Sequence, residues 1–268
     1  LFRSLALHSD EGTFFYALDF KMDDTPVMGN PPNYAKLKEI GKKGVKVLVV
    51  NSLASGSKGR TDSENLARER VKKALASVEK DKKSALFVST FSSQIVRLHS
   101  IIEFGRKTGR KIAILGRSMD KYITCARRSN QWDINDKLNL AKYSRHVNST
   151  LRKINNDRGN YLVICTGHQA EPGSILDRIT NDKTPFIFQP GDNLIFSSRV
   201  IPVEENLKAR KIMDSKLKNK GVKIQDNVHA SGHGSEDDIK MLIEMVKPEN
   251  VIPTHGSPAQ EKPAIEIA

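Results

Sequence analysis

The fold is decided by residues 85–165, where short apolar runs alternate with helical stretches. The runs are Ala85-Leu86-Phe87-Val88, Ile112-Ala113-Ile114-Leu115 and Tyr161-Leu162-Val163-Ile164-Cys165. They are apolar throughout, as strands covered on both faces are. After the first run, a segment that opens at Ser92 or Ser93 carries apolar residues at helical spacing. Strands that alternate with helices predict an α/β protein with a largely parallel sheet.

Working outward from this core, the same signals predict further elements on both sides. Additional strands are predicted at 13–18, 45–50, 185–188, 194–196 and 222–224. Additional helices are predicted at 64–78, 136–155, 204–219 and 236–246. The length of 268 residues allows one large domain or two ordinary ones.

Composition places the chain among globular proteins of a reducing compartment. Hydrophobic residues make up 38% and charged residues 28%, and no apolar run approaches the roughly 18 residues of a membrane span. We therefore expect no membrane partner. Cys125 and Cys165 form no Cys-x-x-Cys pair, which predicts free thiols and a cytoplasmic protein.

The charge balance favours an anionic partner. The formal net charge is +13, from 44 Lys and Arg against 31 Asp and Glu. Such a chain attracts polyanions, of which nucleic acid is the commonest. An abundance of Lys together with Glu is also typical of thermophiles, so the charge by itself leaves both interpretations open.

Several polar segments directly follow predicted strands, where open α/β sheets place their sites. Asp19 ends the first strand and could bind a metal or serve as a turn residue. The segments 90–94, 166–173 and 197–199 combine Gly, Ser, Thr and Arg in patterns suited to phosphate, and equally to ordinary caps and loops.

Three of the seven histidines gather near the end of the chain. His229 and His233 lie four residues apart around Ser231 and Gly232, and His255 follows a short apolar run. Histidines on strand ends and glycine-containing loops are free to meet a metal or a phosphate. Core or surface histidines are the simpler alternative for each one taken alone.

In their order along the chain, these segments resemble a known family. Matching segments are 19–27 (Asp-Phe-Lys), 91–97, 116–119, 166–172 (Thr-Gly-His-Gln-Ala-Glu-Pro), 197–202 (Ser-Ser-Arg-Val-Ile-Pro), 229–233 (His-Ala-Ser-Gly-His) and 253–256 (Pro-Thr-His-Gly). The chain resembles the ribonuclease J family of the metallo-β-lactamase/β-CASP superfamily, in its archaeal form, over essentially its whole length.

The resemblance implies a fold and an activity. The fold would be a metallo-β-lactamase αββα sandwich, incomplete at its N-terminus, with an inserted α/β β-CASP domain. Residues 1–62 and 226–268 would form the sandwich part and residues 63–225 the insert, with RNA entering between them. The activity would be that of a zinc-dependent, processive 5′→3′ exoribonuclease acting on 5′-monophosphorylated RNA, and the family is also expected to form homodimers.

The resemblance also implies roles for particular residues. Asp19 and His255 would be metal ligands, with Asp19 bridging two zinc ions, which suits a shared carboxylate. His233 would donate a proton to the leaving oxygen, a task that suits a histidine near neutral pH, and Glu64 would orient His233. The implied RNA and phosphate contacts are His229, Ser231, Gly232, Ser93, Ser198 and Arg199.

The departures from the family pattern leave alternatives open. The zinc-binding His-x-His-x-Asp-His segment is absent from the 268 residues, His168 replaces a usual Ser, and Leu18 replaces a usual Gly. We expect these residues to be part of a longer enzyme and to be inactive alone. The alternatives are an inactive RNA-binding or scaffold homologue and a β-CASP endoribonuclease of the RNA 3′-end-processing type. Because the front portion of the sandwich is missing, the chain alone should expose an apolar face.

Overall fold

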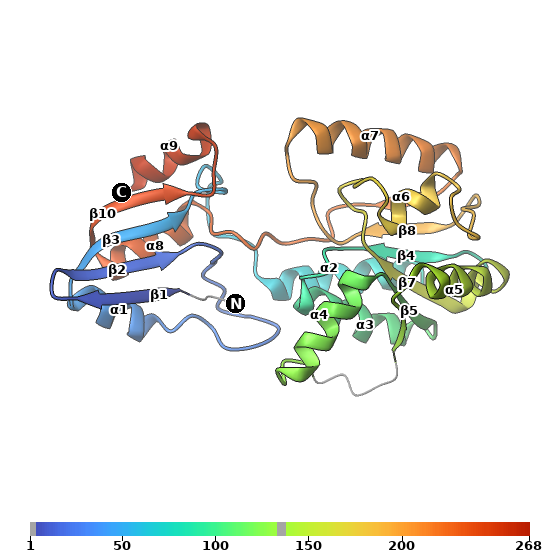
Figure 1. Ribbon diagram of the computed structural model, residues 1–268, viewed down its shortest axis with the longest axis horizontal. Helices are drawn as coiled ribbons and strands as arrows, with labels where there is room; N and C mark the ends of the chain where they lie inside the picture. Colours follow the sequence, from blue (N-terminus) through green and yellow to red (C-terminus); the bar gives the residue numbers. More distant parts are fainter. Residues whose placement is uncertain (1–3, 133–137) are drawn as a thin grey trace. The chain divides into compact units, whose positions relative to one another are not determined.

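The computed structural model describes residues 4–132 and 138–268 and divides the chain into two compact units. Unit 1 combines the two ends of the chain, Leu1–Leu66 and Ala230–Ala268, and unit 2 is Ala67–His229. Unit 1 is therefore drawn in the blue and red ends of the colour scale, and unit 2 in the colours between (Figure 1). The domain boundaries at 62/63 and 225/226 stay predictions, because compactness alone does not identify a domain.

Unit 1 is built on a four-stranded sheet with the order β1-β2-β3-β10 (Figure 1). The strands are β1 (Leu5–Ser9), β2 (Gly12–Ala17), β3 (Val45–Asn51) and β10 (Pro248–Thr254). β1 pairs antiparallel with β2, whereas β2 with β3 and β3 with β10 are parallel. The carboxyl ends of β2, β3 and β10 therefore lie along one edge of the sheet.

One face of this sheet packs against helices. The helices of unit 1 are α1 (Tyr34–Lys42), α8 (Glu236–Val246) and α9 (Pro258–Ile267). Phe15 and Leu48 from the sheet are buried in one cluster with Leu37 of α1 and Leu242 of α8. This packing fixes the sheet against the helix that follows the histidine-containing loop.

The other face of the sheet is apolar and uncovered in the described part of the chain. The strand register aligns Leu5 with Tyr16, Tyr16 with Val49, and Val49 with Ile252. Leu5 and Ile252, at the two ends of this row, are 62% and 49% exposed. Exposed apolar rows of this extent mark an interaction surface, as the sandwich interpretation predicts.

Unit 2 is a six-stranded parallel sheet with the order β6-β5-β7-β4-β8-β9. The strands are β4 (Leu86–Ser89), β5 (Lys111–Leu115), β6 (Asn139–Ala141), β7 (Tyr161–Cys165), β8 (Asn193–Phe196) and β9 (Lys223–Gln225). β7 and β4 are the two central strands, with β5 and β6 on one side and β8 and β9 on the other. The loops that follow β4 and β7 therefore lie side by side at the carboxyl edge.

Helices cover both faces of the unit 2 sheet, as the apolar strands predicted. One face packs against α2 (Glu64–Ser77), α3 (Ile95–Lys107) and α4 (Arg117–Arg128). The other packs against α5 (Ser144–Asn156), α6 (Ile175–Thr180) and α7 (Glu204–Asn219). A short 3₁₀ turn, Arg158–Asn160, precedes β7. The prediction of an α/β protein with parallel sheets is confirmed.

Two sequence predictions are wrong in detail. Residues 185–188 form no strand; Phe186 and Phe188 instead fill the core against Phe87 from an extended segment outside the sheet. The predicted helix at 136–155 is a strand at Asn139–Ala141 followed by α5, because this short segment pairs with Ala113–Leu115. Residues 136 and 137 of that prediction lie outside the described residues.

Candidate metal centre

Asp19 projects from the carboxyl edge of the unit 1 sheet. It follows β2 after one residue, and its side chain is 71% exposed. The next residue, Phe20, is 1% exposed and belongs to the core. Because the chain is anchored directly after Asp19, the carboxylate is held at the edge of the sheet while remaining accessible to a ligand.

His255 comes to the same edge from β10. The strand ends at Thr254, whose carbonyl accepts hydrogen bonds from the backbone N–H and the hydroxyl of Ser52, at 2.9 and 2.8 Å. His255 then adopts a left-handed backbone conformation with φ of 67°. Non-glycine residues in this conformation are strained and concentrate at functional sites. The imidazole that follows this turn is exposed.

His233 is presented by the loop that precedes α8. Its backbone N–H donates to the hydroxyl of Ser231 at 3.0 Å, and its carbonyl accepts from the hydroxyl of Thr61 at 2.9 Å. The loop ends in a capping box, in which Ser235 and Asp238 satisfy the first turn of the helix. These bonds fix the position of the His233 backbone relative to the sheet edge.

The three side chains converge. One ligand atom each of Asp19, His233 and His255 lies within 4.8 Å of the others, and the two imidazole rings are 5.4 Å apart between centroids. Burial lowers the pKa of His233, Asp19 opposes that shift, and His255 adds to it. Imidazole nitrogen and carboxylate oxygen form a donor set that zinc accepts. The residues present therefore fit part of a zinc site.

A group that the sequence analysis missed, Asn51, lies inside this cluster. Asn51 is the last residue of β3 and is fully buried. Its side-chain nitrogen lies 3.1 Å from Nδ1 of His233 and 3.3 Å from Oδ1 of Asp19. A polar residue at the carboxyl end of an apolar strand was the available signal. Nothing in the sequence alone indicated that this strand end would meet His233.

Glu64 makes contacts of a different kind. It is the first residue of α2, and its backbone N–H donates to Oδ2 of Asp23 at 2.7 Å. Its carboxylate lies 4.0 Å from Nζ of Lys21, which is also 3.5 Å from Asp23. The orienting role assigned to Glu64 stays a prediction.

Ser231 and Gly232 form the tight turn before His233. The Ser231 hydroxyl donates to the His233 carbonyl at 3.2 Å in addition to accepting its N–H. A Cβ added to Gly232 would meet nothing within 4 Å. Gly232 is therefore open and exposed, and its contact with RNA stays a prediction.

In unit 2, Ser93 and Ser198 lie in the loops that follow two neighbouring strands. Ser93 follows β4 and Ser198 follows β8, and these strands are adjacent and parallel. Ser93 and Arg199 are exposed, whereas Ser198 is 4% exposed and its hydroxyl has no hydrogen-bond partner among the described residues. A buried polar group in that state is rare in folded proteins and suits a ligand or water contact.

Arg97 fastens this loop to the end of unit 2. It is fully buried and donates to the Ser197 carbonyl at 3.0 Å and to the Val228 carbonyl at 3.1 Å. The next residue, His229, is 9% exposed, and its carbonyl accepts from Arg70 at 2.5 Å. The backbone around His229 is thereby held by two arginines.

His168 is a second buried histidine at this edge of unit 2. Its ring packs edge-on against Phe91, with 3.9 Å between centroids, and it is 1% exposed. Burial, with a smaller contribution from the positive charge of Arg210, lowers its pKa to about 4. His168 is therefore neutral at physiological pH and packs as an aromatic group beside the Ser93 loop.

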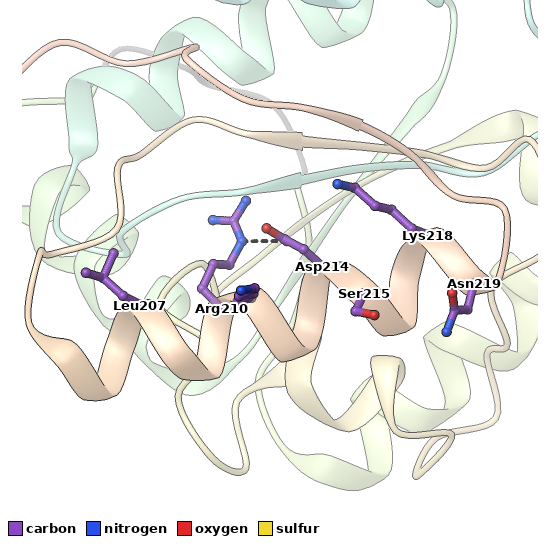
Figure 2. A pocket seen from close by; sticks show the side chains of 7 residues that line it. Leu207, Arg210, Asp214, Ser215, Lys218 and Asn219 are labelled. Atoms are coloured by element: carbon purple, nitrogen blue, oxygen red, sulfur yellow. Dashed lines mark hydrogen bonds and ion pairs between the residues drawn. The ribbon is translucent and has the colours of Figure 1, made fainter.

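The structure also contains a groove apart from the metal centre. It follows one face of α7 and has a volume of about 450 Å³. Figure 2 shows that Arg210 and Asp214, which are joined by a 2.7 Å contact, project from the same side of the helix. No histidine is among its lining residues, which are Leu207, Arg210, Lys211, Asp214, Ser215, Lys218 and Asn219. The helices in residues 4–132 and 138–268 lack the length and apolar composition of a membrane span.

Comparison with known proteins identifies the class of this fold and site. Residues 83–215 match the family model described as the ribonuclease J beta-CASP domain. Residues 221–263 match the model described as the Zn-dependent metallo-hydrolase RNA specificity domain. The chain is therefore a member of the metallo-β-lactamase superfamily that carries a β-CASP domain.

Curated relatives specify the family. The chain is 36% identical to ribonuclease J of Pyrococcus abyssi over 252 residues, which cover 94% of this chain and 55% of that protein. It is 34% identical to ribonuclease J of Methanocaldococcus jannaschii, covering 93% of the chain and 56% of the relative. For ribonuclease J of Helicobacter pylori the identity is 33%, with 94% and 35% covered. The chain belongs to the ribonuclease J family and spans about half the length of its archaeal relatives.

Proposed function

We propose that this chain is part of a metal-dependent ribonuclease that degrades RNA from the 5′ end and prefers a 5′-monophosphate. The observation that carries the proposal is the convergence of Asp19, His233 and His255 at one sheet edge, in a chain whose curated relatives are named ribonuclease J. A bound zinc pair would activate water for attack on a phosphodiester.

The residues of this chain would hold and orient the reacting groups. Asp19 offers an exposed carboxylate and His255 an exposed imidazole, each fixed by the backbone before it. These groups supply only part of the four ligands that a zinc ion takes. We propose that further polypeptide completes the ligand set and covers the apolar row from Leu5 to Ile252.

Two further features support RNA as the substrate. The net charge of +13 favours association with a polyanion. At the carboxyl edge of unit 2, the exposed Ser93 and Arg199 and the buried hydroxyl of Ser198 provide groups that bind phosphate. We propose that these groups, with His229, Ser231 and Gly232, contact the RNA backbone.

The test uses a full-length protein that contains this chain. Purified parent and Asp19→Ala protein are incubated with labelled 5′-monophosphate and 5′-hydroxyl RNA of one sequence. Loss of a metal ligand should lower the cleavage rate by more than about 100-fold, because the metal contributes several kcal/mol to the transition state. Asp10→Ala is the matched control, since Asp10 is an exposed carboxylate in the turn between β1 and β2.

The products separate the alternatives. Mononucleotides released from 5′-monophosphate RNA support the proposal, whereas internal fragments indicate an endoribonuclease. RNA binding without cleavage by the parent indicates the scaffold alternative. Retention of most activity in Asp19→Ala would refute the metal assignment.

A further inference from the structure

The side chain of Gln169 joins two loops at the carboxyl edge of the unit 2 sheet. Gln169 follows β7, and its side-chain nitrogen donates to the backbone carbonyl of Arg199 at 2.8 Å. Its side-chain oxygen accepts the backbone N–H of Ile201 at 2.7 Å. Arg199 and Ile201 follow β8, and β4 lies between β7 and β8 in the sheet. The amide therefore connects two loops whose strands flank β4.

The two partners fix the orientation of this amide. A backbone carbonyl can only accept a hydrogen bond and a backbone N–H can only donate one, so the NH₂ group must face Arg199 and the oxygen must face Ile201. These are the two bonds that one residue of a parallel strand makes to the residues on either side of its partner. Gln169 is 4% exposed, so bulk water does not replace its contacts. The amide thus takes the place of a neighbouring strand for the residues just beyond β8.

The backbone on both sides of Gln169 is held in place. The carbonyl of His168 accepts from Nη1 of Arg210 at 3.2 Å, and the N–H of Ala170 donates to the carbonyl of Gly167 at 3.0 Å. Ala170 has a φ of 57°, a conformation that persists in a non-glycine residue only where the surrounding structure enforces it. The amide therefore projects from a constrained turn, which suits an anchor.

The anchored segment carries two of the candidate phosphate contacts, Ser198 and Arg199. At its start, the N–H of Ser197 donates to the last carbonyl of β4 at 2.9 Å, and at its end Gln169 holds Ile201. Arg199 is exposed, and the hydroxyl of Ser198 has no hydrogen-bond partner among the described residues. A shift of about 1 Å takes a donor out of hydrogen-bond range, so contact with a phosphate depends on where this backbone is held.

We propose that Gln169 is a positioning residue that holds Ser198 and Arg199 where they receive the 5′-phosphate of RNA. The inference rests on the proposed function, since it takes that phosphate as the ligand of these two side chains. Gln169 is buried and both ends of its amide are already bonded, so it acts through the loop and does not touch the substrate. Its oxygen also lies 3.4 Å from the side-chain nitrogen of Asn206 in α7, which extends the anchor to the helix that follows the loop.

Hydrogen exchange tests the anchor without RNA. Gln169→Met removes both hydrogen bonds and keeps much of the volume. In full-length protein, exchange of the Ile201 amide, followed by mass spectrometry of overlapping fragments, should become faster by more than about 10-fold. Gln189→Met is the matched control, because it makes the same chemical change at an exposed glutamine before the amino end of β8. Unchanged exchange at Ile201 in Gln169→Met overturns the proposal.

Cleavage kinetics distinguish positioning from a merely structural role. The rate of the first cleavage is measured on 5′-monophosphate and 5′-hydroxyl RNA. Gln169→Met should raise KM for the monophosphate substrate by about 10-fold, with kcat changed by less than about 3-fold, as loss of a binding interaction does. The preference over 5′-hydroxyl RNA should fall by a similar factor. An equal loss of kcat/KM on both substrates indicates a structural role and overturns the proposal.

A second variant covers the case in which Gln169→Met fails to fold. Gln169→Glu keeps the size of the side chain and the acceptor for Ile201, but places an acceptor against the carbonyl of Arg199. It should reduce the preference for a 5′-phosphate in the same direction, and an unchanged preference contradicts the proposal.

Nucleotide binding separates this inference from the proposed function. In calorimetry with full-length protein, Gln169→Met should weaken binding of adenosine 5′-monophosphate by more than about 10-fold and of adenosine by less than about 3-fold. Equal changes for the two probes overturn the inference. A parent protein that cleaves no RNA refutes the proposed function, whereas the nucleotide and exchange measurements still decide the role of Gln169.

Discussion

Arg210 is expected to make a large polar contribution to the stability of unit 2. Its side chain is 6% exposed and contacts four groups from different parts of the unit. It donates to Asp214 and Asp226, both at 2.7 Å, and to the carbonyl of His168 at 3.2 Å. Its guanidinium also lies 3.3 Å from the ring centroid of Phe196. Replacing it with Met keeps much of the volume and removes every one of these polar contacts.

The magnitude follows from the exposure of each partner. The Asp226 side chain is 50% exposed, so solvent reduces that pair to about 0.5 kcal/mol. The Asp214 side chain is 26% exposed, and we assign that pair about 1 kcal/mol. The His168 carbonyl, left without its donor, costs about 1 kcal/mol, and the ring contact adds about 1 kcal/mol. We expect Arg210→Met to lower the free energy of unfolding by about 3.5 kcal/mol, the sum of these contributions.

The assay uses the one tryptophan of the sequence, Trp132, which is buried in the core of unit 2. Its fluorescence therefore reports the unfolding of unit 2 separately from unit 1. A loss of about 3.5 kcal/mol should lower the melting temperature by about 7–14 °C for a domain of this size. Lys211→Met is the matched control, since Lys211 is an exposed cation in the same groove, and it should change stability by less than about 0.5 kcal/mol.

One outcome would refute this reasoning. If Arg210→Met melts at the temperature of Lys211→Met, the contacts of Arg210 do not stabilise the folded state. A substitution of Asp226 provides a further check, because Asp226→Asn should cost only about 0.5 kcal/mol at this exposed position.

Two more predictions concern pH and the uncovered sheet face. Because burial lowers the pKa of His168 from 6.5 to about 4, the unfolded state binds more protons between these values, so stability should rise from pH 4 to pH 6.5, by up to about 3 kcal/mol. Urea unfolding at several pH values should show a smaller rise of the free energy of unfolding with pH in His168→Phe than in the parent. His146→Phe, a change at an exposed histidine, should keep the full rise. An equal rise in the two variants would contradict the assignment to His168. Tyr16→Lys, in the exposed row of unit 1, should lower self-association and binding of an apolar dye by the 268-residue chain. Tyr122→Lys, at another exposed tyrosine, should change neither, and equal effects of the two would count against the exposed sheet face as the cause.

Local sequence patterns were sufficient for elements whose apolar residues recur with a clear period. The predicted helices at 204–219 and 236–246 coincide with α7 and α8, and the predicted strand at 161–165 coincides with β7. Each of these helices presents buried residues at helical spacing to one core, such as Met213 and Leu217 in α7. A pattern of this kind depends only on residues that are close together in the sequence, so it can be recognised without the tertiary structure.

The two wrong predictions, at 136–155 and 185–188, arose where the structure depends on residues that are distant in the sequence. Residues 139–141 and 185–188 are both short, and their structure depends on whether a partner strand is available. Asn139–Ala141 finds one in Ala113–Leu115, while Phe186 and Phe188 bury their rings without entering the sheet. β-Propensity reports how a side chain fits a surface, and that surface is made by distant parts of the chain.

The sequence by itself determined the alternation of strands and helices, the resemblance to ribonuclease J, and the candidate residues Asp19, His233 and His255. Only the tertiary structure decided that these residues meet, because β3 pairs with a strand about 200 residues further along the chain. It also brought Asn51, which no motif marked, to within 3.1 Å of His233. Residue types and periodicity are local properties, whereas the pairing of strand ends depends on hydrogen bonds between segments that are distant in sequence.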